Sequence, residues 1–474
     1  MSAILMLQAC SLVDPTEVDN PNVTEETFLE LPRISTTWEA GLERQLAITM
    51  NQNVVLAELL SDNYFNNRTL TNKVFDIPQI EYTDIDVLTW QSEVHRLRAM
   101  AEYARDVVTE ADETTTAEQR ASFNFYLGLA HLFSGQYFTG LPAEEGGAVI
   151  SAAEHYRRAS EAFQQAFDSS SDADKLLTYQ MAQARAEFYL GNQDLAVSLA
   201  RSVIASQPLF LRQVAYDQNL QNDMQFYLFD SEANEFAPLP RLDFLDPKYY
   251  HLNNPALERK PIALFKAEEA YLILAEAALA DGDVAGARSE LLNLLTETID
   301  NRPTQTFSDP DNRDGGTNLN VGIPAYPLSD QVTVLPSPQA GSSQTGLILE
   351  RPGLVTVPTV SGTSVTANQL NAASTVDELL EIVYLMRQEV FMAEGIRMID
   401  LGIKVPVAEN EFTGNEQVTQ DDLQAQVPTF LPDEDYAFDN FEFDAAEQQV
   451  VISYNLNQIL VENKSNPLVI PLFN

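Results

Sequence analysis

Five charged residues stand close together near residue 390, and their types are those of acid and base catalysis. They are Arg387, Glu389, Glu394, Arg397 and Asp400. Paired carboxylates beside arginines can move protons to and from a substrate. However, Glu394, Arg397 and Asp400 follow one another at three-residue intervals, where opposite charges on one helix form ion pairs. We therefore expect intrahelical ion pairs, or support against another helix, rather than catalysis. The same interpretation applies to Glu268 and Glu276.

Metal-binding and cofactor-binding patterns are scarce in the sequence. The histidines are His95, His131, His155 and His251. None of them pairs at four-residue spacing and no cysteine cluster accompanies them, so we expect no zinc site. The run from Asp309 to Gly315 resembles a calcium-binding loop, but Pro310 and Arg313 interrupt the alternation of oxygen ligands that such a loop needs. No phosphate-binding glycine loop, nucleophile elbow or dinucleotide motif is present, and we expect no cofactor.

Cys10 is the one cysteine of the chain, and it ends the tetrapeptide Leu7–Cys10 behind an apolar opening. A cysteine in that position resembles the lipid acceptor of a bacterial lipoprotein. We therefore expect residues 1–9 to be a signal segment and Cys10 to carry the lipid, with residues 10–23 as a linker. Such a chain is anchored to a membrane and does not span it.

The charge balance is strongly acidic, with 27 Lys and Arg against 70 Asp and Glu, a net charge of −43. Such a surface repels phosphate backbones, so nucleic acid is excluded as a partner. The acidic residues are spread along the chain and 45% of the residues are hydrophobic, which argues against disorder.

Helix signals recur through the chain. Capping pairs are expected at Thr116 with Gln119, at Ser151 with Glu154, and at Ser374 with Asp377. Each pair precedes apolar residues at three- and four-residue spacing, which is typical of amphipathic helices that pack on a neighbour.

One turn pattern occurs twice and predicts how the helices pair. Gly191 and Gly282 each follow an alanine by seven residues and precede another by five. Glycine permits a left-handed turn, and small residues let two helices approach closely. The second helices share a four-then-three spacing in Ala159-Phe163-Ala166, Ala196-Ala200-Val203 and Ala287-Leu291-Leu294. This is the pattern of tetratricopeptide helix pairs.

Long irregular segments separate the predicted helices, so the chain is not a regular solenoid. We expect a mainly α protein with one domain over 24–474. Its helical scaffold is expected at about 24–206, 261–300 and 374–404. Insertions are expected at about 61–86, 135–147, 207–260 and 302–372, the last with a few short strands.

Several blocks together resemble the SusD/RagB family. They are the Leu7–Cys10 tetrapeptide, the loop Gly135–Pro142, the run Ile262–Ala277, and the segments Arg387–Glu389 and Glu394–Gly402. Their order and spacing extend over nearly the whole chain.

The resemblance implies a lipoprotein on the outer-membrane surface that captures a nutrient, commonly an oligosaccharide. It also implies a SusC-like TonB-dependent transporter as partner, which imports the nutrient. Four tetratricopeptide-like helix pairs would form the scaffold, with the ligand site on the insertions, and the protein would not be an enzyme. Contact with the membrane would be through the lipid anchor only.

A glycan site needs flat rings to stack on sugars and polar side chains to bind hydroxyl groups. The cluster that meets this requirement is Tyr64, Phe65, Asn66, Asn67 and Arg68. Secondary candidates are Tyr82, Tyr249, Tyr250 and His251. The alternative for each ring is an anchor in the core. For Trp38 and Trp90, which stand at helical spacing, the core is the expected place.

Two other functions remain open on the sequence. One is a surface glycoside hydrolase, because any acidic chain offers carboxylate pairs that suit glycosidic cleavage. The other is a tetratricopeptide scaffold that binds a peptide in a concave groove.

Overall fold

The computed structural model describes residues 25–66, 72, 74–231, 235–309, 326–469 and 473. The predicted lipid site Cys10, the ligand candidates Asn67 and Arg68, and most of the predicted calcium loop lie outside these residues. Within the described part, no helix has the length and apolar character needed to cross a bilayer.

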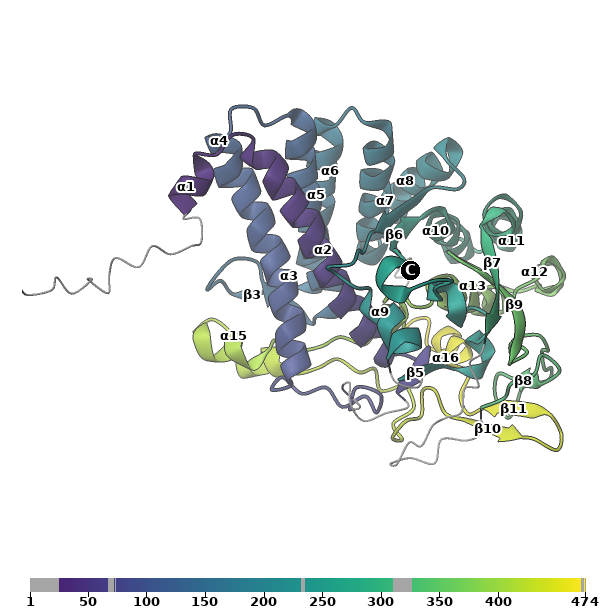
Figure 1. Cartoon of the computed structure of the whole chain (residues 1–474). Helices are drawn as coiled ribbons and strands as arrows, with labels where there is room; N and C mark the ends of the chain where they lie inside the picture. The colour runs from purple at the N-terminus through teal and green to yellow at the C-terminus, as the bar shows by residue number, and fades with distance from the viewer. Residues whose placement is uncertain are drawn as a thin grey trace, which may run out of the picture.

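The molecule is mainly α-helical, and four consecutive helix pairs build its scaffold (Figure 1). The pairs are α2 (Ile34–Leu59) with α3 (Ile85–Tyr103), α5 (Ala117–Tyr137) with α6 (Ala152–Ser169), α7 (Ala173–Leu190) with α8 (Gln193–Ser206), and α10 (Ala267–Ala280) with α11 (Val284–Asn293). The tetratricopeptide-like arrangement predicted from the sequence is confirmed.

The two glycine turns have the same geometry, as predicted. Gly191 and Gly282 have φ angles of 75° and 76°, in the left-handed region. In both turns the glycine N–H donates to the carbonyl three residues back, and the next N–H reaches five residues back. The nine residues of the three predicted four-then-three stripes are all buried. Small side chains at these positions therefore let each second helix pack closely on its partner.

Two of the three predicted helix N-caps are confirmed. Thr116 and Gln119 form a complete capping box, and the Ser151 hydroxyl accepts from the Glu154 N–H. The third prediction, Ser374 with Asp377, is wrong by one residue. Helix α13 (Val376–Val390) begins at the box formed by Thr375 and Glu378. The longer glutamate side chain reaches back to the N–H of its cap, which explains the choice.

The strands are short and lie mostly in the irregular segments. Antiparallel pairs are β1 (Tyr64–Asn66) with β5 (Phe236–Pro238), β2 (Gly140–Pro142) with β3 (Val149–Ser151), β4 (Leu211–Val214) with β6 (Ile262–Lys266), and β7 (Thr304–Asp309) with β9 (Gly353–Pro358). A three-stranded sheet has the order β10 (Phe441–Asp444), β11 (Gln449–Ile452), β8 (Thr333–Leu335), with β8 parallel to β11. The β1–β5 pair joins two of the predicted insertions that are far apart in sequence, and the β4–β6 pair joins an insertion to the segment before α10.

Shorter helices complete the chain. They are α1 (Glu25–Leu29), α4 (Thr109–Ala111), α9 (Asp223–Gln225), α12 (Ala367–Ala372), α14 (Arg397–Asp400), α15 (Glu409–Gly414) and α16 (Leu456–Glu462). Single π-helical turns occupy Ala104–Val108, Phe226–Asp230 and Leu294–Thr298, and 3-10 turns occupy Pro240–Leu242, Asp246–Tyr249, Pro255–Leu257, Ile299–Asn301 and Gln420–Leu423.

One large hydrophobic cluster joins scaffold and insertions, from Leu42 to Phe473. Trp90 is fully buried in it, and its indole N–H donates to Asn53 Oδ1 at 2.7 Å. Trp38 is half-buried against the same cluster. Both tryptophans thus serve packing, as their spacing predicted.

Candidate functional site

The first part of the predicted aromatic cluster belongs to the core in this structure. Tyr64 is 0% exposed and Phe65 is 7% exposed. The Phe65 ring lies 6.3 Å from that of Tyr326 and 5.9 Å from that of Phe441, centroid to centroid. Asn66 is buried as well. Protein therefore covers the ring faces that a sugar would need, and the predicted ligand role of these residues stays a prediction.

Three of the secondary candidates, Tyr249, Tyr250 and His251, lie in or next to a segment that contacts the sheet of β7 and β9. Tyr249 is buried and its hydroxyl donates to the Ala393 carbonyl at 3.0 Å. Tyr250 stacks on Phe307 of β7 at 4.2 Å and on His251 at 5.3 Å, with the planes within 6° of parallel. The structure thus builds a stack of three rings that the sequence did not indicate.

Three of the predicted ligand residues keep exposed surface. Tyr82, Tyr250 and His251 are each half-buried. His251 is fixed in place, because its Nε2 lies 2.9 Å from Asp230 Oδ1 and its Nδ1 lies 2.7 Å from the Asn253 carbonyl. A ligand would meet a preformed surface here, and the role of these residues also stays a prediction.

The predicted ion pairs within one helix near residue 390 are wrong. Helix α13 ends at Val390, and α14 begins only at Arg397. Between them Ala393 and Gly395 have positive φ angles of 58° and 76°. This break removes Glu394 from the helical register of Arg397 and Asp400.

The arginines instead bind carboxylates from elsewhere in the fold. Arg387 makes two hydrogen bonds to Asp400, at 2.9 and 2.6 Å, and Arg397 makes two to Asp62, at 2.5 and 2.9 Å. All four side chains are buried. The alternative of support between elements is therefore confirmed.

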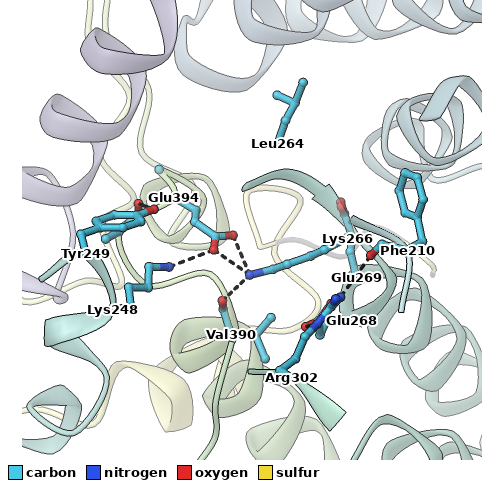
Figure 2. A network of polar contacts seen from close by, with 12 residues as sticks. Phe210, Lys248, Tyr249, Leu264, Lys266, Glu268, Glu269, Arg302, Val390 and Glu394 are labelled. Carbon is cyan, nitrogen blue, oxygen red and sulfur yellow. Dashed lines mark hydrogen bonds and ion pairs between the residues drawn. The ribbon is translucent and has the colours of Figure 1, made fainter. Parts of the chain in front are cut away.

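Glu394 holds two lysines together in the interior (Figure 2). Lys248 Nζ lies 2.9 Å and Lys266 Nζ lies 2.7 Å from its carboxylate, and Lys266 also donates to the Val390 carbonyl at 2.6 Å. Burial lowers the pKa of Lys266 to about 8, although the nearby Glu394 carboxylate opposes the shift. Three segments distant in sequence meet at this carboxylate.

The start of α10 contributes two further buried pairs to this network. Glu268 accepts two hydrogen bonds from Arg302, at 2.8 and 2.7 Å, and Glu269 accepts two from Arg185, both at 2.6 Å (Figure 2 shows the first pair). A space of about 10 Å³ borders Glu394 and Arg185, which is room for one water molecule. Each of these carboxylates is bound to a buried cation, so we interpret the network as support between elements.

Glu276 differs from the other buried carboxylates. It is 2% exposed, and neither of its carboxylate oxygens has a hydrogen-bond partner among the described residues. Burial raises its pKa well above the ordinary value of 4.5, and the nearby Arg387 opposes this only in part. Its predicted ion pairing is wrong, because Asp400 occupies the guanidinium of Arg387.

Two histidines that are far apart in sequence make direct contact. His131 Nδ1 lies 3.0 Å from His155 Nδ1, and His155 Nε2 lies 3.0 Å from the Leu141 carbonyl. Burial lowers the pKa of both rings. Across the described residues, no group of three or more His, Cys, Asp or Glu side chains is arranged to hold a metal ion. We interpret the pair as a packed contact between α5 and α6.

An open space borders α13 and α16. The two helices pack on each other near β8 (Figure 1). We refer to this space as the α13–α16 hollow. Its volume is about 490 Å³, within the range of small-molecule sites. It is lined by Arg241, Val334, Pro336, Ser342, Ser343, Gln344, Leu347, Gln369, Ala372, Ala373, Glu378, Glu381, Ile382, Leu385, Asn455 and Asn457. These described residues include no aromatic ring, which differs from the glycan site expected on the sequence.

Two charged side chains in the wall of the hollow, Arg241 and Glu381, form no direct ion pair with a described residue, although the charge of each acts on the other. Arg241 is half-buried and has neither a hydrogen bond nor an ion pair with any residue that the structure describes. Burial lowers its pKa, while the charges of Glu389 and Asp62 oppose the shift. Glu381 Oε1 accepts from Asn455 Nδ2 at 2.8 Å and has no cationic partner in the described part of the chain. The wall therefore offers both a donor and an acceptor to a ligand.

A row of hydrogen bonds fixes the amide of Asn457, which also lines the hollow. Asn457 Nδ2 donates to Gln388 Oε1 at 3.1 Å, and Gln388 Nε2 donates to Asp62 Oδ2 at 2.9 Å. Asp62 is the partner of Arg397. Asn457 Oδ1 is buried and has no hydrogen-bond partner among the described residues.

A second hollow of about 630 Å³ lies between α2, α5, α7 and β4. Charged side chains in its wall already have protein partners. Glu43 binds both Arg212, at 2.7 Å, and the Tyr126 hydroxyl, at 2.6 Å. Lys175 lies 3.5 Å from Glu39 and donates to a serine. The rings in its wall are buried. The α13–α16 hollow is therefore the better candidate for ligand binding.

Sequence reasoning did not find the residues of the α13–α16 hollow. Arg241, Glu381 and Asn457 come from a 3-10 turn, from α13 and from α16, more than 70 residues apart in each case. No short motif connects them, and nothing in the local spacing could have revealed them.

The fold resembles that of solved sugar-binding proteins from Bacteroides vulgatus. No protein-family model matches the sequence, and no curated protein matches it either. The crystal structure of a SusD-like carbohydrate binding protein aligns with a TM-score of 0.50 and 13% identity, over 77% of this chain and 83% of that one. A putative sugar binding protein aligns with a TM-score of 0.51 and 13% identity, over 82% of this chain and 90% of the other. The chain therefore has a SusD-like fold.

Proposed function

We propose that this protein is a SusD/RagB-type binding protein that captures an oligosaccharide at the cell surface and passes it to a TonB-dependent transporter. The observation that carries the proposal is the SusD-like fold, shared over about four-fifths of the chain with two proteins described as sugar-binding. The capture step requires no chemistry on the ligand. This agrees with the carboxylates of Glu268, Asp400 and Asp62, which are buried and each bound to an arginine.

The α13–α16 hollow is the proposed place of capture. Its volume suits a short oligosaccharide, and its wall combines apolar side chains with amide, hydroxyl and charged groups. Tyr82, Tyr250 and His251, which do not line the hollow, stay proposed ligand residues of a separate surface, since their side chains keep exposed area. Each contact would contribute a modest amount to affinity, so release to the transporter stays possible.

Binding of purified protein to a panel of oligosaccharides, measured by calorimetry, tests the capture step. We expect saturable binding of at least one oligosaccharide without release of new reducing ends. Turnover of the sugar would instead identify a surface glycoside hydrolase, with carboxylates at a suitable separation. Retention of the protein on a peptide array and on no glycan would favour a peptide-binding scaffold.

The lipid anchor at Cys10 is proposed from the sequence. The change Cys10→Ser removes the acceptor thiol, so the variant is expected in the soluble fraction while the wild-type chain sediments with outer membranes. Equal sedimentation of both chains would contradict the anchor. Co-purification of a TonB-dependent transporter with the wild-type chain from solubilised outer membranes tests the proposed partner, and its absence would contradict that part of the proposal.

A further inference from the structure

Two polar groups of the α13–α16 hollow have no hydrogen-bond partner among the described residues, and their hydrogen-bonding chemistry differs. The guanidinium of Arg241 is half-buried and only donates, so it can bind an acceptor of the ligand. The amide oxygen of Asn457 is buried and only accepts, so it needs a donor. The missing partner of this oxygen destabilises the free protein, and a ligand that supplies a donor regains that energy.

The orientation of the Asn457 amide is determined by its neighbours. Asp62 is bound to Arg397 through both oxygens, so it acts as an acceptor, and Gln388 must turn its NH₂ toward it. Gln388 Oε1 is then the atom available to Asn457, which must turn its own NH₂ toward Gln388. The oxygen of Asn457 is left over as the atom without a partner. A buried ion pair thus determines which atom of Asn457 remains for a ligand.

We propose that the α13–α16 hollow binds neutral, hydroxyl-bearing sugars and discriminates against uronic-acid and sulfated glycans. A sugar hydroxyl accepts from Arg241 and donates to Asn457 Oδ1, whereas a carboxylate or sulfate group can only accept. Glu378 and Glu381 in the same wall, and the net charge of −43, repel an anionic ligand further. The inference rests on the proposed glycan capture and narrows its substrate class.

The first test uses the wild-type protein and needs no variant. Neutral tetrasaccharides of glucose, xylose and mannose are compared with galacturonate and mannuronate tetramers by calorimetry. We expect at least one neutral probe to bind about tenfold or more tightly than either acidic probe. Its affinity should change less than about twofold between about 50 and about 500 mM salt, because no ion pair forms.

Variants then separate donation by Arg241 from its charge. Arg241→Gln keeps a donor and should weaken the best neutral probe only about threefold, whereas Arg241→Ala should weaken it about tenfold or more. Asn457→Ala should also weaken binding, and its melting temperature shows whether it folds. The matched control is Arg120→Gln, an exposed arginine outside the hollow, which should bind as wild type does.

The outcomes distinguish this inference from the proposed function. Binding of an acidic probe as tightly as the best neutral one overturns the inference but leaves glycan capture standing. Unchanged binding by folded Arg241→Ala also overturns the inference, because the sugar then lies elsewhere. Binding of no probe by wild-type protein overturns both.

Discussion

A single carboxyl group, that of Glu276, stands buried on α10 without a hydrogen-bond partner among the described residues. Burial of a charge without compensation is costly, and a carboxyl group avoids the cost by keeping its proton. The raised pKa of Glu276 expresses this preference for the neutral form. The group is therefore a source of pH-dependent instability rather than of function.

The change Glu276→Gln is expected to stabilise the protein at neutral pH and to do nothing in acid. The folded-state pKa lies above the ordinary 4.5, so the stability that the neutral form provides is present below pH 4.5 and lost as pH rises. The variant keeps a neutral side chain at every pH. We expect a gain of about 1–3 kcal/mol near pH 8 and none near pH 4, from chemical denaturation at both.

The exposed residue Glu409 supplies the control for this measurement. The change Glu409→Gln should shift stability by about 0.5 kcal/mol or less at either pH. A Glu276→Gln variant that is less stable than wild type near pH 8 would mean that the carboxylate is stabilised by a contact in solution.

The rings of Tyr64 and Phe65 are buried in the core, so we expect their removal to lower the stability of the protein. The change Phe65→Ala removes a buried ring from the contacts with Tyr326 and Phe441, and we expect it to cost about 3–5 kcal/mol. Thermal denaturation measures the loss. Leu354→Ala, at a side chain that is 76% exposed on β9, is the control and should melt as wild type does. A Phe65→Ala chain that melts normally and loses glycan affinity would restore the original prediction of a ligand ring.

The helix pairs depend on backbone geometry at their turns. In the α10–α11 pair, Gly282 has a φ of 76°, and a Cβ atom built on it would meet nothing within 4 Å. The requirement for glycine is thus conformational rather than steric, because left-handed backbone disfavours other residues.

The change Gly282→Ala should therefore destabilise the protein by about 1–2 kcal/mol through the turn alone. Gly414 is the matched control, since its Cβ position is equally open and its φ is not positive. Gly414→Ala should be neutral or slightly stabilising, because alanine lowers the entropy of the unfolded chain. Equal effects of both changes on the free energy of unfolding would show that turn geometry is not the cause.

The sequence predicted the elements whose causes are local. The Gly191 and Gly282 turns and the alanine stripes of the second helices follow from spacing within about 15 residues, and the structure confirms them. The predicted pairing of Glu394 with Arg397 was wrong because Gly395 breaks the helix between them. The glycine at position 395 was a local signal for this break, of the same kind as Gly191 and Gly282, and the prediction overlooked it.

The sequence did not predict the ion pairs between residues that are far apart along the chain. Arg397 binds Asp62 across 335 positions, and the hollow combines side chains from separate insertions. In a chain with 70 acidic residues, every arginine has many equally plausible partners. Only the tertiary fold selects one of them, so the candidate site could not be predicted even though its scaffold could.

On the scale of the whole molecule, much of the scarce positive charge lies inside. Among the described residues, the buried cations that bind buried carboxylates are Arg185, Lys248, Lys266, Arg302, Arg351, Arg387 and Arg397. As a set, these cations are balanced by the carboxylates that they bind, so the net charge of −43 comes from acidic residues outside these pairs. Repulsion among surface carboxylates opposes the compact state.

Added salt should accordingly stabilise the folded protein. Screening shortens the range of repulsion from about 30 Å at 0.01 M to less than about 10 Å above 0.1 M ionic strength. We expect the melting temperature to rise by about 3–8 °C between about 0.01 and about 0.5 M NaCl. KCl should give the same rise, because screening depends on ionic strength. A melting temperature that falls with salt would show that surface attraction, not repulsion, dominates.

Because these arginines and lysines are buried, the surface that one copy of the chain presents to another is mainly acidic. Each copy is surrounded by a layer of counter-ions, sodium or potassium. When two surfaces approach within about 8 Å at physiological salt, these layers overlap and the copies repel each other. We therefore expect copies of the chain to repel one another in concentrated solution and to resist aggregation.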